Sequence, residues 1–144
     1  GEEVTSEIRS FEVNQIVSPI SSIVRVRLKM VDLQRKMAEG KDVIMEGRDI
    51  GTYVFPNADV KIYLDADVEE RAKRRFNENQ EKGIDVSFED VLENIKKRDE
   101  NDTHKENGSL KIAEDAVIVD STKLSIEEMA DAVEKIILEK TGEK

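Results

Sequence analysis

The sequence lacks cysteine and tryptophan, and it holds one histidine among 144 residues. Without cysteine, a disulfide framework and thiolate chemistry are excluded. His104 has no cysteine or second histidine to join it in a transition-metal site, and we interpret it as a surface residue. Nothing resembles the apolar core of a secretory signal or a membrane span. These absences favour a soluble, cytoplasmic protein.

Aromatic residues are also scarce, at 4% of the chain, whereas charged residues reach 39%. Acidic residues outnumber basic ones by 33 to 23, which gives a formal net charge of −10. Such a charge argues against a nucleic acid polymer or an anionic membrane surface as a general partner. It leaves room for a small anion held by a local group of arginines. The length fits a single domain, and clear periodic segments argue against disorder.

Helical periodicity extends over residues 18–39. Ser18 and Pro19 suit a helix cap and first residue, and Gly40 suits a C-terminal stop. Three later helices are expected to begin after Asp67, Ser87 and Ser125. The last should bury a face made of Ile126, Met129, Ala130, Val133, Ile136 and Ile137.

Short apolar runs predict strands at 42–46, 60–65 and 116–120. The third run is continuous enough to be buried on both faces. Because helices separate most of these strands, we expect an α/β fold, with a parallel sheet covered by helices on both faces.

The first of these runs ends at a charged loop, Met45–Gly51, which contains Arg48 and Asp49 between two glycines. Ligands of α/β proteins bind at the carboxyl ends of strands, and an arginine fork suits phosphate. A solvated loop with an internal Arg48–Asp49 pair is the alternative interpretation.

Other charges lie on otherwise apolar helical faces. Arg27 falls within an apolar stripe, so it either extends to the edge of that stripe or has a ligand or acidic partner. The face that begins with Phe88 ends with Arg98, Asp102 and Lys105, which predicts either a helix pointing into a cleft or a solvated helix end. Arg71, Arg74 and Arg75 could converge on one ligand, or could pair along a solvated face, as Glu70 and Arg74 would.

Five stretches together resemble the bacterial cytidylate kinases: residues 43–52, 54–66, 69–75, 95–102 and 120–128. The resemblance covers essentially the whole chain. It implies the P-loop nucleoside monophosphate kinase fold, incomplete at the N-terminus. It also implies transfer of the γ-phosphoryl group of ATP to CMP or dCMP, with Mg²⁺ as cofactor, in pyrimidine nucleotide metabolism.

The resemblance also implies the site. The CMP-binding side chains would be Ser18, Arg27, Arg48, Asp49, Arg98, Asp102 and Lys105. Ser18, Arg27 and Asp49 would meet the cytosine, and Arg48 would hold the monophosphate. Arg98 and Asp102 would face phosphate and ribose. Arg48 and Arg98 are the expected catalytic residues, whereas Arg71, Arg74 and Arg75 could contact ATP phosphates near a lid. No metal-ligating residue is expected.

Three departures from the family pattern stand out. The Gly-x-x-x-x-Gly-Lys-Ser/Thr loop that cradles ATP phosphates is absent. Glu46 stands where the family usually has aspartate. Lys105 replaces an arginine, so a point charge replaces a fork, and Gly108-Ser109 replaces an Ala-Pro turn.

We interpret Gly1 as the continuation of a segment that begins upstream, or as a residue left by a tag. We therefore expect the larger, C-terminal part of a cytidylate kinase, with little kinase activity of its own. Its expected parts are a substrate-side segment and helix (1–40), strands with the CMP-binding loop (41–66), a lid-bearing helical pair (67–107) and a final strand and helix (108–144).

The expected partners are CMP or dCMP and ATP. A monomer is expected for the full-length family, with self-association open to this chain. Two alternatives remain: a non-catalytic CMP-binding fragment or half of a split or swapped assembly, and an acidic α/β domain whose arginines only pair with carboxylates.

Overall fold

A computed structural model describes residues 2–5, 7–104 and 109–142. Its helices are α1 (Phe11–Ser21), α2 (Val24–Ala38), α3 (Val68–Glu81), α4 (Phe88–Thr103) and α5 (Ile126–Thr141). The strands are β1 (Ile62–Asp65) and β2 (Val117–Asp120). A short 3-10 helix, Glu7–Arg9, precedes α1, and a π-helical turn, Ile50–Val54, lies between α2 and β1. The chain is thus a helix-rich α/β protein, as predicted.

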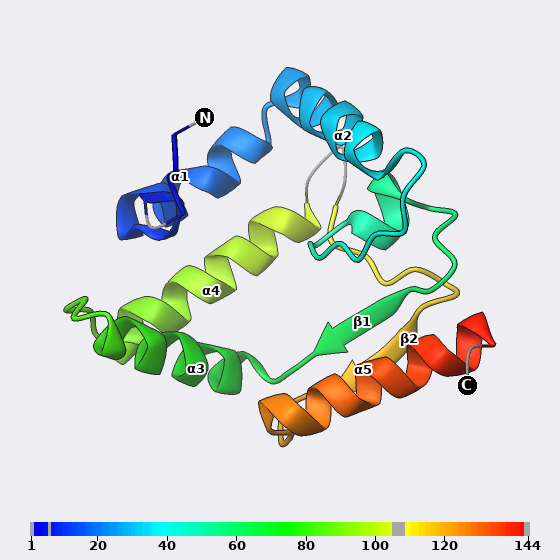
Figure 1. The fold of residues 1–144 in the computed structure, drawn as a ribbon. Coiled ribbons are helices and arrows are strands. Elements are labelled where there is room, and N and C mark those ends of the chain that lie inside the picture. Colours follow the sequence, from blue (N-terminus) through cyan, green and yellow to red (C-terminus); the bar gives the residue numbers. More distant parts are fainter. Residues whose placement is uncertain (1, 6, 105–108, 143–144) are drawn as a thin grey trace.

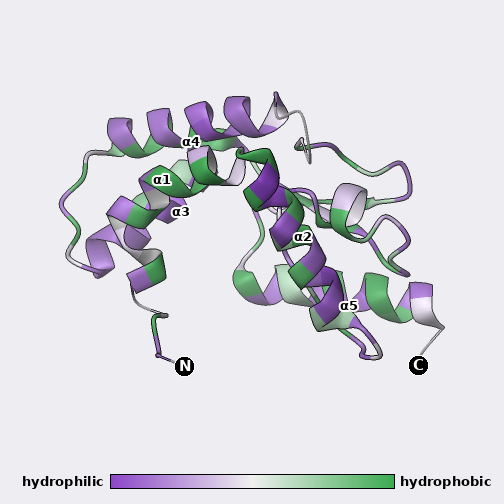
Figure 2. Cartoon of the chain, turned by 90° about the horizontal axis from the view of Figure 1, so that it is seen from above, coloured by the Kyte–Doolittle hydropathy of each residue, from purple (hydrophilic) through white to green (hydrophobic). Residues whose placement is uncertain are grey.

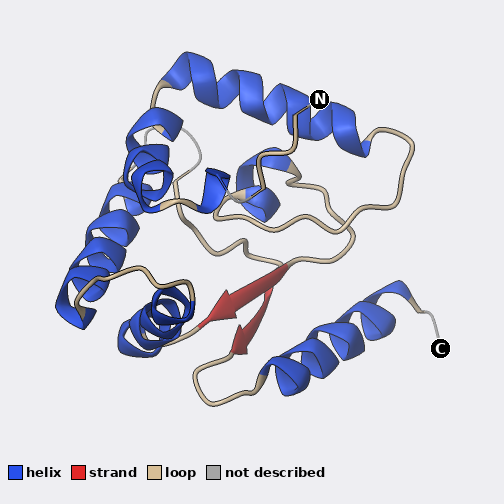
Figure 3. Ribbon diagram, turned by 60° about the vertical axis from the view of Figure 1, so that its left-hand side comes forward, coloured by secondary structure: helices blue, strands red, loops and turns tan. Residues whose placement is uncertain are grey.

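The two strands pair in parallel, with Ile62 opposite Val117 and Asp65 opposite Asp120. α5 packs along β2, while α1 and α2 cross the opposite end of the molecule (Figure 1). Figure 3 shows the sheet between α5 and the loops that lead to the π-helical turn. The predicted parallel sheet is therefore confirmed as a small one within the described residues.

The α3–α4 hairpin is the best-packed helical unit. Ala72 and Val91 are buried between its helices, and the rings of Phe76 and Phe88 meet edge to face with centroids 6.0 Å apart. Ser87 caps α4 as predicted, because its Oγ accepts a hydrogen bond from the Asp90 amide (3.1 Å). In Figure 2, hydrophilic residues lie along the outer side of α4 and hydrophobic ones toward α1 and α3. This packing fixes the direction in which the end of α4 points.

The predicted helix over 18–39 is wrong in its boundaries, because two helices occupy this region. α1 begins after Ser10, whose Oγ accepts from the Val13 amide (3.3 Å), so Pro19 falls inside α1 and not at a helix start. α1 continues two residues past Pro19 and ends where the Ser22 amide donates to the Pro19 carbonyl at 3.2 Å. Ile23 then adopts an extended conformation and begins α2.

The predicted strand over 42–46 does not form. No strand among the described residues pairs with this segment, which has no regular secondary structure, and Ile44 is 93% exposed. An apolar run becomes a strand only when another strand supplies its hydrogen bonds. The expectation that the third strand is buried on both faces is also wrong, because Ile118 of β2 is 56% exposed.

The last helix begins where it was predicted to begin. Ser125 and Glu128 form a reciprocal capping box, in which each side chain bonds the other residue's amide (3.1 and 2.8 Å). Its predicted inner face is only partly correct, since Ile126 is 77% exposed and Ala130 is also exposed. In the ranges that the structure describes, no helix has the length and apolarity needed to cross a membrane.

Candidate functional site

The loop of residues 46–49 is held by the π-helical turn that follows it. The Asp49 carbonyl accepts the amides of Tyr53 (2.9 Å) and Val54 (3.2 Å), and the turn ends on the buried Val54 side chain. Arg35 of α2 closes the turn, because its Nε and Nη2 donate to the carbonyls of Val54 and Tyr53, each at 2.9 Å. The segment is thereby fixed against α2.

Gly47 lets the loop fold tightly over this turn. A Cβ at Gly47 would lie 2.9 Å from Cγ1 and 3.2 Å from Cδ1 of Ile50. Such a separation is shorter than a normal carbon–carbon contact. Glycine at this position therefore allows the backbone to pass close to Ile50 before it presents Arg48 and Asp49.

Arg27 of α2 forms an ion pair and hydrogen bond with Asp49. Both side chains are nearly buried, with 14% of Arg27 and 9% of Asp49 exposed. The Arg27 guanidinium also lies over the Tyr53 ring, 5.8 Å from its centroid, in a cation–π arrangement. Burial lowers the pKa of Arg27 from its usual value. Of the interpretations left open for Arg27, the structure shows an acidic partner.

A second ionic group lies where α4 meets the loop. Arg48 Nη1 contacts Asp99 Oδ1 at 2.7 Å and Asp102 Oδ2 at 3.0 Å. Asp99 Oδ2 in turn contacts Arg71 Nη1 at 2.7 Å. Arg98 Nε lies 3.8 Å from Asp102 Oδ2, and the Asp102 side chain is only 4% exposed. Three arginines from three elements thus surround two carboxylates.

The electrostatics of this group favour an anion. Burial lowers the pKa of Arg98, and the nearby positive charge of Arg48 lowers it further, whereas Asp102 opposes the shift. Arg48, Arg71 and Arg98 carry three positive charges against the two negative charges of Asp99 and Asp102. Their exposed fractions are 35%, 37% and 37%, so the arginines remain accessible to a ligand.

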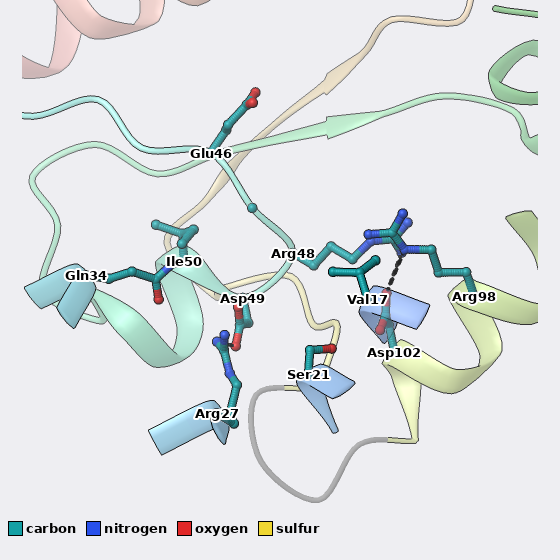
Figure 4. Close-up of a pocket in the computed structure, with 11 residues that line it drawn as sticks. Val17, Ser21, Arg27, Gln34, Glu46, Arg48, Asp49, Ile50, Arg98 and Asp102 are labelled. Atoms are coloured by element: carbon teal, nitrogen blue, oxygen red, sulfur yellow. Dashed lines mark hydrogen bonds and ion pairs between the residues drawn. The ribbon is translucent and has the colours of Figure 1, made fainter. Parts of the chain in front are cut away.

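The two ionic groups open onto one pocket (Figure 4). Its lining comes from α1, α2, the loop and α4: Val17, Ser21, Arg27, Gln34, Glu46, Gly47, Arg48, Asp49, Ile50, Arg98 and Asp102. Figure 4 shows the guanidinium groups of Arg48 and Arg98 converging, with Arg27 and Asp49 at the other side of the pocket, whereas Glu46 points away from the arginines. The loop is therefore part of a cavity lining.

Five of the residues expected to bind CMP line this pocket, namely Arg27, Arg48, Asp49, Arg98 and Asp102. Ser18 lies in α1, but its side chain is outside the described part of the structure, and Lys105 is outside the described residues altogether. The internal Arg48–Asp49 pair of the alternative interpretation is wrong, because each residue pairs with another element. The solvated helix end is wrong too, because Asp102 is buried.

The three arginines of α3 do not converge. Arg74 contacts Glu70 at 3.3 Å, the pair anticipated from the sequence, and donates to the Ser121 carbonyl at 2.6 Å. Arg75 contacts Glu78 at 3.2 Å. Arg71 contacts the second ionic group through Asp99, and, beyond burial, the charge of Arg75 helps to lower the pKa of Arg98.

Sequence reasoning missed Asp99 and Gln34. The signal for Asp99 was its position three residues before Asp102, which places both carboxylates on one side of α4. Among the described residues, no group of three or more histidine, cysteine, aspartate or glutamate side chains could hold a metal ion. The residues at this pocket do not by themselves fit a Mg²⁺ site, so no chemical step is assigned to that ion.

The fold and the pocket define an α/β protein with an arginine-lined site suited to a phosphorylated ligand. Comparison with known proteins is more specific, because the family model for cytidylate kinase matches residues 1–139. The chain belongs to the cytidylate kinase family.

Curated relatives agree with this assignment. The cytidylate kinase of Caldicellulosiruptor bescii is 53% identical over 133 residues, which cover 92% of this chain and 59% of the relative. That of Flavobacterium johnsoniae is 47% identical over 137 residues (95% and 60%), and that of a Geobacillus species is 49% identical over 142 residues (99% and 63%). The chain thus spans about three fifths of the length of these relatives.

Proposed function

We propose that the pocket binds CMP or dCMP as the phosphoryl acceptor of a cytidylate kinase. The observation that carries the proposal is the meeting of two different ionic groups in one pocket. The buried Arg27–Asp49 pair offers fixed donors and acceptors to a base edge, and the partly exposed Arg48 and Arg98 offer donors to a phosphate. Asp102, beside Arg98, would accept from the ribose hydroxyls.

In the proposed reaction, an oxygen of the CMP phosphate attacks the γ-phosphorus of ATP and ADP leaves, which yields CDP. Catalysis of such transfers consists mainly of positioning and of neutralising charge on the phosphoryl oxygens. Arg48 and Arg98 could supply both to the acceptor phosphate. Mg²⁺ belongs to this proposal only as the companion of ATP.

Titration calorimetry with CMP tests the assignment. Arg48→Ala and Arg98→Ala should each raise the Kd for CMP by about 10- to 100-fold, since a charge-assisted hydrogen bond contributes about 1.5–3 kcal/mol. Asp115→Asn is the matched control, because Asp115 pairs with Lys61 (2.8 Å) outside the pocket lining. Unchanged CMP affinity in both arginine variants, with altered stability alone, would show that these arginines serve only the fold.

We further propose that these 144 residues alone have little or no kinase activity, because they contain no Gly-x-x-x-x-Gly-Lys-Ser/Thr motif for the ATP phosphates. CDP formation from ATP and CMP at high protein concentration measures this. Robust turnover by the verified 144-residue chain would refute it. Addition of a strand and a phosphate loop of this kind upstream should restore activity.

A further inference from the structure

Asp99 occupies a bridging position that the proposed function does not use. Its two carboxylate oxygens are divided between two arginines: Oδ1 accepts from Arg48 Nη1 and Oδ2 accepts from Arg71 Nη1, each at 2.7 Å. Arg48 belongs to the loop and Arg71 to α3, 23 positions apart in the sequence. Asp99 therefore joins the loop to the α3–α4 hairpin through a single side chain.

The far end of this chain of contacts is anchored to the backbone. Arg71 Nε donates to the Ala66 carbonyl at 3.1 Å, directly before α3, and Ala66 is buried. Arg71 is thus held at two of its guanidinium nitrogens, Nε and Nη1. Asp99 receives its second hydrogen bond from an arginine that is itself held in place.

Only one nitrogen of Arg48 is used in these contacts. Nη1 serves both Asp99 and Asp102, and within the described residues no side chain accepts a hydrogen bond from Nη2 or Nε of Arg48. Because the guanidinium is planar and two carboxylates hold Nη1, the other donors of Arg48 stay available to a further partner. Figure 4 shows that the Arg48 guanidinium meets that of Arg98 at the pocket.

Asp99 is suited to remain a carboxylate in this position. Burial by itself would raise its pKa, but the hydrogen bonds and charges of Arg48 and Arg71 lower the pKa overall. The side chain is 23% exposed, so it is neither fully solvated nor sealed off from a ligand. A negative charge beside two arginines keeps them close together despite their mutual repulsion.

We propose that Asp99 is a positioning residue, which ties Arg48 to the anchored Arg71 so that the unused edge of Arg48 faces the phosphate of the acceptor nucleotide. This inference rests on the proposed function, since it requires that Arg48 bind that phosphate. It also places Arg71 on the acceptor side of the site, as the support of Arg48. An ordered arginine binds an anion more tightly than a mobile one, because less side-chain entropy is lost on binding.

The test separates phosphate binding from base binding. CMP and cytidine are titrated into the 144-residue chain and into Asp99→Asn, and the ratio of the two affinities is compared. Asp99→Asn should lower the CMP-to-cytidine affinity ratio about tenfold, which is the lower part of the range for a charge-assisted hydrogen bond. Asp115→Asn, which makes the same chemical change in an ion pair outside the pocket lining, should leave the ratio unchanged.

Two results would overturn the proposal: a ratio that stays unchanged, as it would if CMP and cytidine lost affinity equally, or a ratio that rises because a negative charge near the phosphate has been removed. Arg48→Ala separates this failure from failure of the proposed function. If Arg48→Ala lowers the ratio and Asp99→Asn does not, only the positioning role is wrong. If neither lowers it, the phosphate assignment of Arg48 is wrong as well.

Arg71→Met provides a second route that leaves the Asp99 carboxylate in place, in case Asp99→Asn does not fold. It should lower the affinity ratio in the same direction, because Asp99 would lose its anchored partner. The CMP-to-cytidine affinity ratio of the double variant Asp99→Asn/Arg71→Met should be no lower than that of the more affected single variant. Both substitutions break the same chain of contacts, so their effects should not add. Additive losses from the two substitutions would contradict the proposal.

Discussion

The two sides of the pocket use the same kinds of residue in different ways. On one side, Arg27 and Asp49 are almost fully buried and satisfy each other. On the other, Arg48 and Arg98 share acidic partners but keep more than a third of their surface exposed. A buried pair serves the fold and presents a fixed edge, whereas a half-exposed group of arginines can exchange contacts with an incoming anion.

The largest effect on stability should come from the buried side. Arg27→Met leaves the Asp49 carboxylate buried without its partner, which should lower the free energy of unfolding by about 3 kcal/mol. Denaturant unfolding measures it. Asp32→Asn on the same helix is the control, because Asp32 pairs with Lys29 and Lys36 at an exposed surface and should change stability by less than about 0.5 kcal/mol.

The double variant Arg27→Met/Asp49→Leu extends this test. Replacing a buried ion pair by apolar residues of similar size is often neutral, so stability should largely recover while CMP binding does not. If the double variant also regained CMP affinity, the pair would have no role in recognising the base. If Arg27→Met lowered the free energy of unfolding no more than Asp32→Asn does, the Arg27–Asp49 pair would not be the stabilising side of the pocket.

Gly47→Ala should lower stability less than Arg27→Met does, and it should disturb both sides of the pocket together. The added Cβ would press on Ile50 at 2.9 Å and move the backbone that carries Arg48 and Asp49. We expect a loss of about 1–2 kcal/mol in stability, with a parallel fall in CMP affinity. Gly40→Ala serves as the comparison, since its Cβ would meet nothing within 4 Å, although its positive φ of 67° adds backbone strain. Gly40→Ala should therefore change stability but leave CMP affinity intact.

Ser125→Ala should lower stability by about 1 kcal/mol without any effect on CMP affinity. It removes one half of the α5 capping box, which lies outside the pocket lining. Thermal unfolding and a CMP titration check both parts. A loss of CMP affinity in Ser125→Ala would mean that affinity follows global stability. Changes in CMP affinity could then not be assigned to either side of the pocket.

The smallest effect concerns pH. The pKa of Asp99 is lowered in the folded chain, so its ionised form adds stability above the ordinary aspartate value of about 4, and this contribution is lost as the pH falls through the lowered pKa. The stability difference between the chain and Asp99→Asn should therefore be constant above about pH 5 and shrink in more acidic solution. A difference that grew on acidification would contradict the assigned ion pairs.

Local signals in the sequence were reliable guides to helix starts. Ser87 and Ser125 cap helices as predicted, because a side-chain oxygen and an amide three residues on are all that such a cap needs. Ser18-Pro19 misled for the same local reason, since the pair also fits inside a helix that starts earlier, at Ser10. Residues 42–46 failed as a strand because pairing depends on a distant partner that composition does not reveal.

The site was partly predictable. Arg27 stood out as a charge within an apolar stripe, but only the structure shows Asp49 as its partner. Arg98 and Asp102 stood out by their spacing on one helical face. Asp99 did not stand out, because its importance comes from two arginines on other elements, and such a meeting is set by tertiary packing.

The most direct test of the central claim is a calorimetric titration of the 144-residue chain with CMP and, separately, with ATP. We predict that CMP binds, that Arg48→Ala weakens this binding by at least about tenfold, and that ATP binds far more weakly than CMP. Binding of ATP without CMP, or of neither nucleotide, would contradict the assignment of this pocket to the phosphoryl acceptor.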